Sequence, residues 1–313
     1  MVIEDLRYYV QVAMKNTFVA FAIALGLCGS AVAADVAMPT KAPITSPAAI
    51  QGWTYTLTPY FWAISLDGST TVKGRTTEVN ASVFDILDHT QFPKGMFQLA
   101  ALGEARNGRF GLLADVLYMK ADLGASITRT RGTDAFGGAL GVSAGLGFEM
   151  VIAQVAAAYE FARWNGMTSP GSTTALDIYA GGRAWWQRAD VQVALTGTAN
   201  ILDLTVSRAG VLSAEKSVSW FDPLVGLRLR HQFNPAMNFI LSGDVGGFDV
   251  GSKFSWQVLG ALDYEFCRSK NVTWSGMLGY KALSVDYSQG SGLSRYEFDM
   301  TMHGPIFGVT ARF

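Results

Sequence analysis

Charged side chains recur at every second position in several apolar stretches of this 313-residue chain. Arg228 and Arg230 stand two apart in "WFDPLVGLRLR", and Asp263 and Glu265 do so in "FSWQVLGALDYEF". Guanidinium and carboxylate groups form strong, often bidentate pairs when they meet. On one shared wall they can build a closed ion-pair network, or they can line a polar conduit with a mixed-charge constriction. Both kinds of chemistry need a surface that gathers residues far apart in the chain.

The residues between these charges predict the element that carries them. In 254–266 the alternate positions are mostly large and apolar, and the positions between them include Ser255, Gln257 and Asp263. A period of two indicates a β-strand with one apolar and one polar face. The same period recurs in 97–106, 153–161, 176–186, 221–230 and 239–248.

The spacing of aromatic residues predicts which face meets lipid. Trp256 and Phe266 lie ten residues apart on one face. At ~3.3 Å per residue and a tilt near 40°, this spacing covers roughly 25 Å, the height of the lipid-facing band of an outer-membrane barrel. After residue 33 no segment has the ~20 uninterrupted apolar residues of a membrane helix, and a closed barrel is the other structure that spans a bilayer. We therefore expect the apolar face to meet lipid and the charged face to line the lumen.

The whole pattern predicts an all-β chain, a transmembrane antiparallel up-and-down β-barrel of about ten strands. Short turns such as 106–110, 233–238 and 267–271 alternate with longer connections, as in barrels with short periplasmic turns and long extracellular loops. Twelve strands are the alternative, if 70–82 and 190–208 also cross the membrane. The expected strands are 53–66, 94–106, 109–123, 149–163, 174–188, 218–232, 237–248, 252–267, 271–287 and 296–313. The expected long loops are 67–93, 124–148, 189–217 and 288–296.

The N-terminal region predicts an address outside the cytoplasm. From Met14 the chain reads "MKNTFVAFAIALGLCGSAVA", with a Lys, an apolar run over 18–28 and an A-x-A site ending at Ala33. This is the layout of a secretory signal peptide cleaved after Ala33, so 1–13 is an upstream extension. Residues 34–52 hold three prolines among small residues and predict a flexible periplasmic tether. The barrel is then 53–313, in the outer membrane of a Gram-negative bacterium.

Several motifs resemble known sequences. "YTLTPYFWAISLDG" (55–68), "VFDILDH" (83–89), "GDVGGFDVGSKFSWQ" (243–257) and the C-terminal "GPIFGVTARF" resemble a family of uncharacterised proteobacterial outer-membrane β-barrels. The stretch "ADVAMPTKAP" after Ala33 is similar to the start of alphaproteobacterial outer-membrane surface proteins. The terminal Phe313 resembles the signal that the bacterial barrel-assembly machinery reads. The resemblance implies a fold and a compartment, and it carries over no functional residues.

The polar face supplies the candidate site residues. Acids and bases are nearly balanced among them, which suits both a salt-bridge network and a conduit. The predicted lumen charges are Glu104, Arg106, Asp115, Glu160, Asp177, Arg183, Asp222, Arg228, Arg230, Asp244, Asp263, Glu265, Lys281 and Arg312. Ser242, Asp244 and Asp222 are the expected neighbours of the two arginines of "GLRLR".

The first long loop holds a possible constriction. Apolar residues at helix-like spacing between two aspartates predict a short amphipathic helix. It either folds into the barrel mouth and narrows it or caps the extracellular rim. The segment consists of Val83, Phe84, Asp85, Ile86, Leu87 and Asp88.

Three functions follow from these expectations. A narrow passive pore for small polar solutes is the leading hypothesis, and a closed structural or surface-interaction barrel of the antigen or adhesin type, without transport, is the alternative. A barrel enzyme is a remote third, because His89 beside Asp88 and His303 near the outer rim lack a clustered nucleophile.

The sequence also bounds the partners. No spacing of ligands predicts a metal, and no glycine loop or basic run predicts a phosphate cofactor or nucleic acid. The expected partners are outer-membrane lipid and lipopolysaccharide, with the barrel-assembly machinery during biogenesis.

Overall fold

The computed structural model describes residues 52–313, except 73–74, 83–95, 134–135 and 202–203. The predicted signal peptide, nearly all of the tether and the predicted constriction segment 83–88 lie outside the described residues. Among the described residues, no helix has the length and apolar character needed to cross a membrane.

Twelve strands make up the described fold. They are β1 (Thr54–Trp62), β2 (Ser65–Val72), β3 (Arg75–Ala81), β4 (Met96–Asn107), β5 (Phe110–Thr133), β6 (Phe136–Asn165), β7 (Thr173–Ile201), β8 (Leu204–Asn234), β9 (Met237–Gly246), β10 (Phe254–Arg268), β11 (Thr273–Gln289) and β12 (Tyr296–Arg312). A 3-10 turn, η1 (Gly292–Ser294), joins the last two strands.

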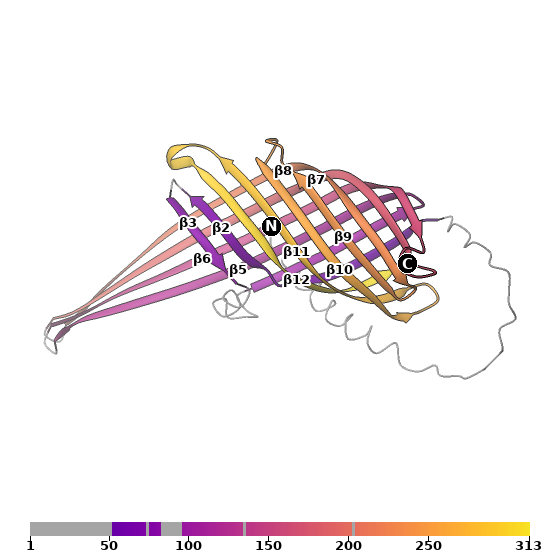
Figure 1. Ribbon diagram of the computed structural model, residues 1–313. Helices are drawn as coiled ribbons and strands as arrows, with labels where there is room; N and C mark the ends of the chain where they lie inside the picture. The colour runs from indigo at the N-terminus through magenta and orange to yellow at the C-terminus, as the bar shows by residue number, and fades with distance from the viewer. Residues whose placement is uncertain (1–51, 73–74, 83–95, 134–135, 202–203) are drawn as a thin grey trace, which may run out of the picture. The chain divides into compact units, whose positions relative to one another are not determined.

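Ten of these strands close into an antiparallel ring. β1 pairs with β4 on one side and with β12 on the other, and β4 to β12 pair in chain order (Figure 1). Closure leaves no edge strand in the wall, so its backbone groups are paired within the ring. The predicted ten-stranded barrel is confirmed. Residues 70–82 and 190–208 do not add two further crossings.

The β2–β3 hairpin extends the wall beside β12. β1 pairs with β12 up to Trp62 and Ile306, and β2 takes over at Ser65 and His303. The backbone N–H of Ala63 donates to the carbonyl of Pro305 at 2.9 Å across the break between β1 and β2. β3 pairs with β2 alone. The first predicted loop is therefore partly a hairpin.

Two other predicted long loops are strands. β5 and β6 stay paired through Thr133 and Phe136, and β7 and β8 stay paired through Ile201 and Leu204. Their neighbours stop earlier, since β4 leaves β5 at Ala121. Figure 1 shows β5 to β8 running on together. The prediction of loops at 124–148 and 189–217 was wrong, because hairpin partners satisfy each other's backbone groups without help from the rest of the ring.

The two ends of the ring differ. We call the end that carries Thr54, Arg312 and the short reversals at 108–109, 166–172, 235–236 and 269–272 the turn end. The opposite end, with the long hairpins, is the loop end. The predicted contrast between short turns and long connections therefore holds, although hairpins replace two of the loops.

The wall is apolar outside and mixed inside. On β10, Leu262 is 42% exposed and Tyr264 62% exposed, while Gln257 and Asp263 are buried, as predicted. The same outward exposure of large apolar residues continues around the ring. It includes Leu57, Leu112, Val155, Phe161, Ile178, Trp186, Phe221, Leu227, Leu278 and Phe307.

Substitution by arginine tests this facing. Leu262→Arg, in the middle of β10, is expected to cost about 2–4 kcal/mol of insertion free energy near the bilayer midplane. Phe266→Arg, on the same face near the turn end, is expected to cost only about 0–1 kcal/mol. The fraction folded into lipid vesicles, read from heat-modifiable migration on gels, measures both. Equal effects at the two depths would contradict a lipid-facing wall.

The interior contains an apolar cluster that the sequence did not predict. Trp62, Trp185, Met302 and Ile306 point inward, where a polar lining was predicted, and they are 0% exposed. We call this cluster, from the middle of the ring to its loop end, the apolar plug. Its larger members are Tyr60, Trp62, Ile64, Leu117, Met119, Met150, Ile152, Trp185, Trp220, Leu283, Val285, Tyr287, Tyr296, Phe298, Met300, Met302 and Ile306.

Aromatic stacking connects the plug across several strands. The rings of Trp185 and Trp220 lie 5.2 Å apart between centroids, and those of Trp220 and Tyr287 lie 4.0 Å apart, both nearly parallel. Tyr287 in turn contacts Tyr296 at 6.3 Å. The stack therefore joins β7, β8, β11 and β12 inside the ring, where water is excluded.

Candidate functional site

An ion-pair network occupies the interior toward the turn end. Its centre is Asp177 on β7, which is 0% exposed. Its Oδ2 accepts hydrogen bonds from Arg106, Arg228 and Arg230, each at 2.9 Å to the nearest guanidinium nitrogen. We call the set the arginine–carboxylate network. It consists of Glu104, Arg106, Glu160, Arg163, Asp177, Arg228 and Arg230.

Strand register places these groups together. Glu160 pairs with Asp177 between β6 and β7, and Asp177 pairs with Arg228 between β7 and β8. Arg230 lies two residues further on the same face of β8. Glu104 comes from β4, which β5, β6 and β7 separate from β8 in the ring. Partners along the wall and across the bore therefore meet at one level.

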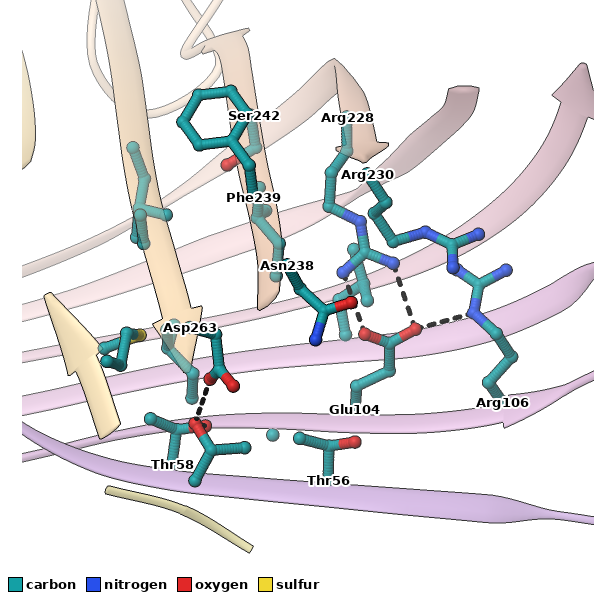
Figure 2. A pocket seen from close by; sticks show the side chains of 18 of the residues that line it. Thr56, Thr58, Glu104, Arg106, Arg228, Arg230, Asn238, Phe239, Ser242 and Asp263 are labelled. Atoms are coloured by element: carbon teal, nitrogen blue, oxygen red, sulfur yellow. Dashed lines mark hydrogen bonds and ion pairs between the residues drawn. The ribbon is translucent and has the colours of Figure 1, made fainter. Parts of the chain in front are cut away.

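One contact spans the bore. Both terminal nitrogens of Arg228 donate to the carboxylate of Glu104 at 3.0 Å, and the Nε of Arg106 donates to the same carboxylate at 2.6 Å (Figure 2). A bidentate pair between β8 and β4 fixes two opposite walls. It also narrows the interior at this level.

Two of the expected neighbours of Arg228 and Arg230, Asp244 and Asp222, do not bind them. Asp244 instead accepts from Arg183 at 2.7 Å. Asp222 accepts from the indole N–H of Trp185 at 3.0 Å and from the backbone N–H of Ser252 at 2.7 Å. Ser242 of β9 does lie beside Arg228 in register, but both arginines bind Asp177 of β7 on their other side, and Arg228 also reaches Glu104 across the interior.

A third contact group marks the boundary of the apolar plug. Lys281 Nζ lies 2.5 Å from Asp115 and 2.9 Å from the hydroxyl of Tyr60. The ammonium also stands 4.9 Å from the ring centroid of Trp62, within cation–π range. Lys281 is 2% exposed, so its charge is fully enclosed by these partners.

Twelve of the fourteen predicted charges lie inside the wall. They are Glu104, Arg106, Asp115, Glu160, Asp177, Arg183, Asp222, Arg228, Arg230, Asp244, Asp263 and Lys281. The other two lie at the turn end, where Glu265 pairs with Arg268 at 2.7 Å and Arg312 is exposed.

Sequence reasoning missed one member of the network. Arg163, whose side chain is 49% exposed, binds Glu160 through two hydrogen bonds of 2.7 Å, but a bulge between Glu160 and Ala162 changes the parity of β6. Parity did place the neutral residues Gln154 and Tyr179 on the inward face, but it did not predict their contacts with Arg183 and Asp244.

A cavity of about 330 Å³ lies beside the network. Threonines of β1, Asn238 and Phe239 of β9, Asp263 of β10 and Thr310 of β12 line it, with Arg228 and Arg230 on the far wall (Figure 2). Its lining includes the strand-end residue Arg312, so the cavity reaches the turn end. We call it the turn-end cavity.

Of the residues considered for catalysis, the structure describes only His303. His89 and Asp88 lie outside the described residues. His303 lies on the outer wall, where its Nδ1 is 2.6 Å from the hydroxyl of Tyr280 and its Nε2 is 2.7 Å from Asp67. These contacts join β2, β11 and β12. In the part of the chain that the structure describes, no group of three or more His, Cys, Asp or Glu side chains is placed to hold a metal.

The fold and its apolar exterior define the class, a closed β-barrel of the outer-membrane type. No family model and no curated protein matches the chain. Several solved structures share the barrel architecture. A FadL homologue from Pseudomonas aeruginosa matches at 9% identity and a TM-score of 0.29, covering 83% of this chain and 90% of its own.

Two further solved structures match at lower TM-scores. The translocator domain of the autotransporter NalP from Neisseria meningitidis matches at 11% identity and a TM-score of 0.25, over 82% of this chain and 86% of its own. OccK2 from Pseudomonas aeruginosa matches at 10% identity and a TM-score of 0.18, over 83% and 98%. At these TM-scores the likeness carries no argument about function.

Proposed function

We propose that this chain is an outer-membrane barrel closed to polar solutes, with a structural or surface-interaction role. The observation that supports it is the apolar plug, whose inward residues Trp62, Trp185 and Met302 are inaccessible to water. An ion or sugar crossing such a layer loses its hydration and gains few polar partners in exchange. The ion pair of Arg228 with Glu104 narrows the interior at a second level, beside the turn-end cavity.

The proposed orientation places the turn end in the periplasm and the long hairpins outside the cell. An even number of ring strands puts Thr54 and Arg312 at the same end, which suits a chain that enters from the periplasm. Lipid, lipopolysaccharide and the barrel-assembly machinery remain the proposed partners, with Phe313 as the assembly signal. Membership of the uncharacterised barrel family remains a prediction.

The pore remains the second candidate because of the turn-end cavity. Its polar lining provides half of a pathway for a small solute. Conduction would require the plug to move, since its side chains fill the loop-end half of the interior. An enzyme on the outer wall is a weaker candidate, supported only by the contacts of His303.

Single-channel recording distinguishes the first two. The refolded protein in planar bilayers is expected to show no conductance steps. The double variant Trp62→Ala/Trp185→Ala removes the two largest plug side chains and is expected to conduct. Trp186→Ala is the matched control, because Trp186 follows directly on β7 but points outward and is 48% exposed. Regular steps from the unchanged protein would overturn closure and favour the pore.

A further inference from the structure

We propose that the turn-end cavity binds a small zwitterion, of the class of a free amino acid or dipeptide, with its ammonium group at Asp263. Asp263 is 7% exposed, and its Oδ2 accepts a hydrogen bond from Thr310 at 2.8 Å. Its Oδ1 is buried and has no hydrogen-bond partner among the described residues. No cation of the described residues forms an ion pair with it.

Hydrogen-bond direction makes this wall an acceptor. The hydroxyl of Thr310 donates to Asp263, so in its 2.9 Å contact with Thr58 it must accept. Each hydroxyl has one hydrogen, and both hydrogens are therefore used within the wall. Asp263 and Thr58 both line the cavity, and the lone pairs of their oxygens are what this part of the wall offers to a ligand. A ligand meets this wall favourably only with donors, and a positive charge offsets the cost of a buried, unpaired carboxylate.

The opposite wall has the opposite charge. In the arginine–carboxylate network the three interior guanidinium groups balance the three carboxylates, and the fourth, Arg163, lines the cavity with a side chain that is 49% exposed. Arg312 adds an exposed guanidinium at the mouth. A carboxylate fits this side, as an ammonium fits the side of Asp263.

The space between the walls suits a small ligand. A volume of about 330 Å³ is at the lower end of small-molecule sites, which take compact ligands. Figure 2 shows Asn238 between Asp263 and Glu104, where its amide can both donate and accept. Met277, which pairs with Asp263 on the inward face, supplies an apolar part of the lining for a side chain. A zwitterion complements both walls of the cavity, and an uncharged sugar of equal size would complement neither.

Calorimetry on the refolded full chain in detergent micelles tests the proposal. Dialanine is the zwitterionic probe, N-acetylalanine carries only the anion, ethylamine only the cation, and glucose neither. We expect dialanine to bind in the millimolar range or tighter, with each single-charge probe weaker by about tenfold or more. No heat with dialanine, or equal binding of glucose, would overturn the proposal.

Three variants locate the ligand. Asp263→Asn keeps the shape and is expected to weaken dialanine about tenfold or more. Arg312→Gln changes an exposed group, so the barrel still folds, and it is expected to weaken dialanine while leaving ethylamine unchanged. Asp299→Asn, at an exposed position toward the loop end of β12, is the control and is expected to have no effect. Undiminished binding by a folded Asp263→Asn variant would exclude Asp263 as the anchor. Because binding is measured directly, the result is independent of whether the barrel conducts.

Discussion

Replacing Asp177 by alanine is expected to lower the free energy of unfolding by about 3–5 kcal/mol, the cost of breaking a buried ion pair on one side. Asp177 is fully buried and accepts from three arginines of two strands. Without it, Arg228 and Arg230 remain inside with fewer carboxylates than guanidinium groups. Their charges then repel each other where water cannot screen them.

Unfolding by urea in lipid vesicles, followed by tryptophan fluorescence, gives this free energy. Glu265→Ala is the matched control, since Glu265 pairs with Arg268 near the turn end, where the arginine side chain is 62% exposed. Exposed pairs contribute about 0–1 kcal/mol, so its loss is expected to be small. If the two alanine variants unfolded at the same urea concentration, the network would not be an essential support of the interior.

Trp185→Ala is expected to cost about 3–5 kcal/mol as well, for a different reason. The side chain is fully buried, stacks on Trp220 and donates its indole N–H to Asp222. Its removal leaves a cavity among apolar neighbours and takes one of the hydrogen bonds from a buried carboxylate.

Two comparisons make this prediction specific. Trp186→Ala removes the same side chain from the lipid side, where acyl chains can fill the gap, and the expected loss is smaller. Trp185→Phe keeps most of the ring and loses the indole N–H, so it separates the hydrogen bond from the volume. A loss at Trp186 equal to that at Trp185 would contradict a close-packed plug.

Sequence periodicity predicted the ring well because facing is a local property. Parity on each strand sets which residues point inward, and it placed Glu160, Arg183 and Asp244 inside without knowledge of their partners. Counting the apolar stretches also predicted the ten strands of the ring. Parity failed where the register shifts, as at the bulge before Arg163.

Which charged residues pair with each other, and whether side chains fill the interior, depend on contacts between distant strands. The sequence did not predict either. Glu104 and Arg228 are 124 residues apart and meet only because the ring brings β4 opposite β8. Likewise, Met302 in a strand alternates like its neighbours whether the interior around it is wet or dry. Strand length was missed for a related reason, since polar and small residues in 124–148 suit a loop until a hairpin partner is known.

The seam between β1 and β12 constrains when the barrel can form. It joins Thr56 to Arg312 and Trp62 to Ile306, so the pairing that completes the wall needs the last residues of the chain. Contacts so distant in sequence form slowly, because the intervening chain must first be ordered. The ring can therefore close only after β12 has been synthesised. A chain that lacks β12 would have two unpaired edges, on β1 and β11, in place of a closed wall.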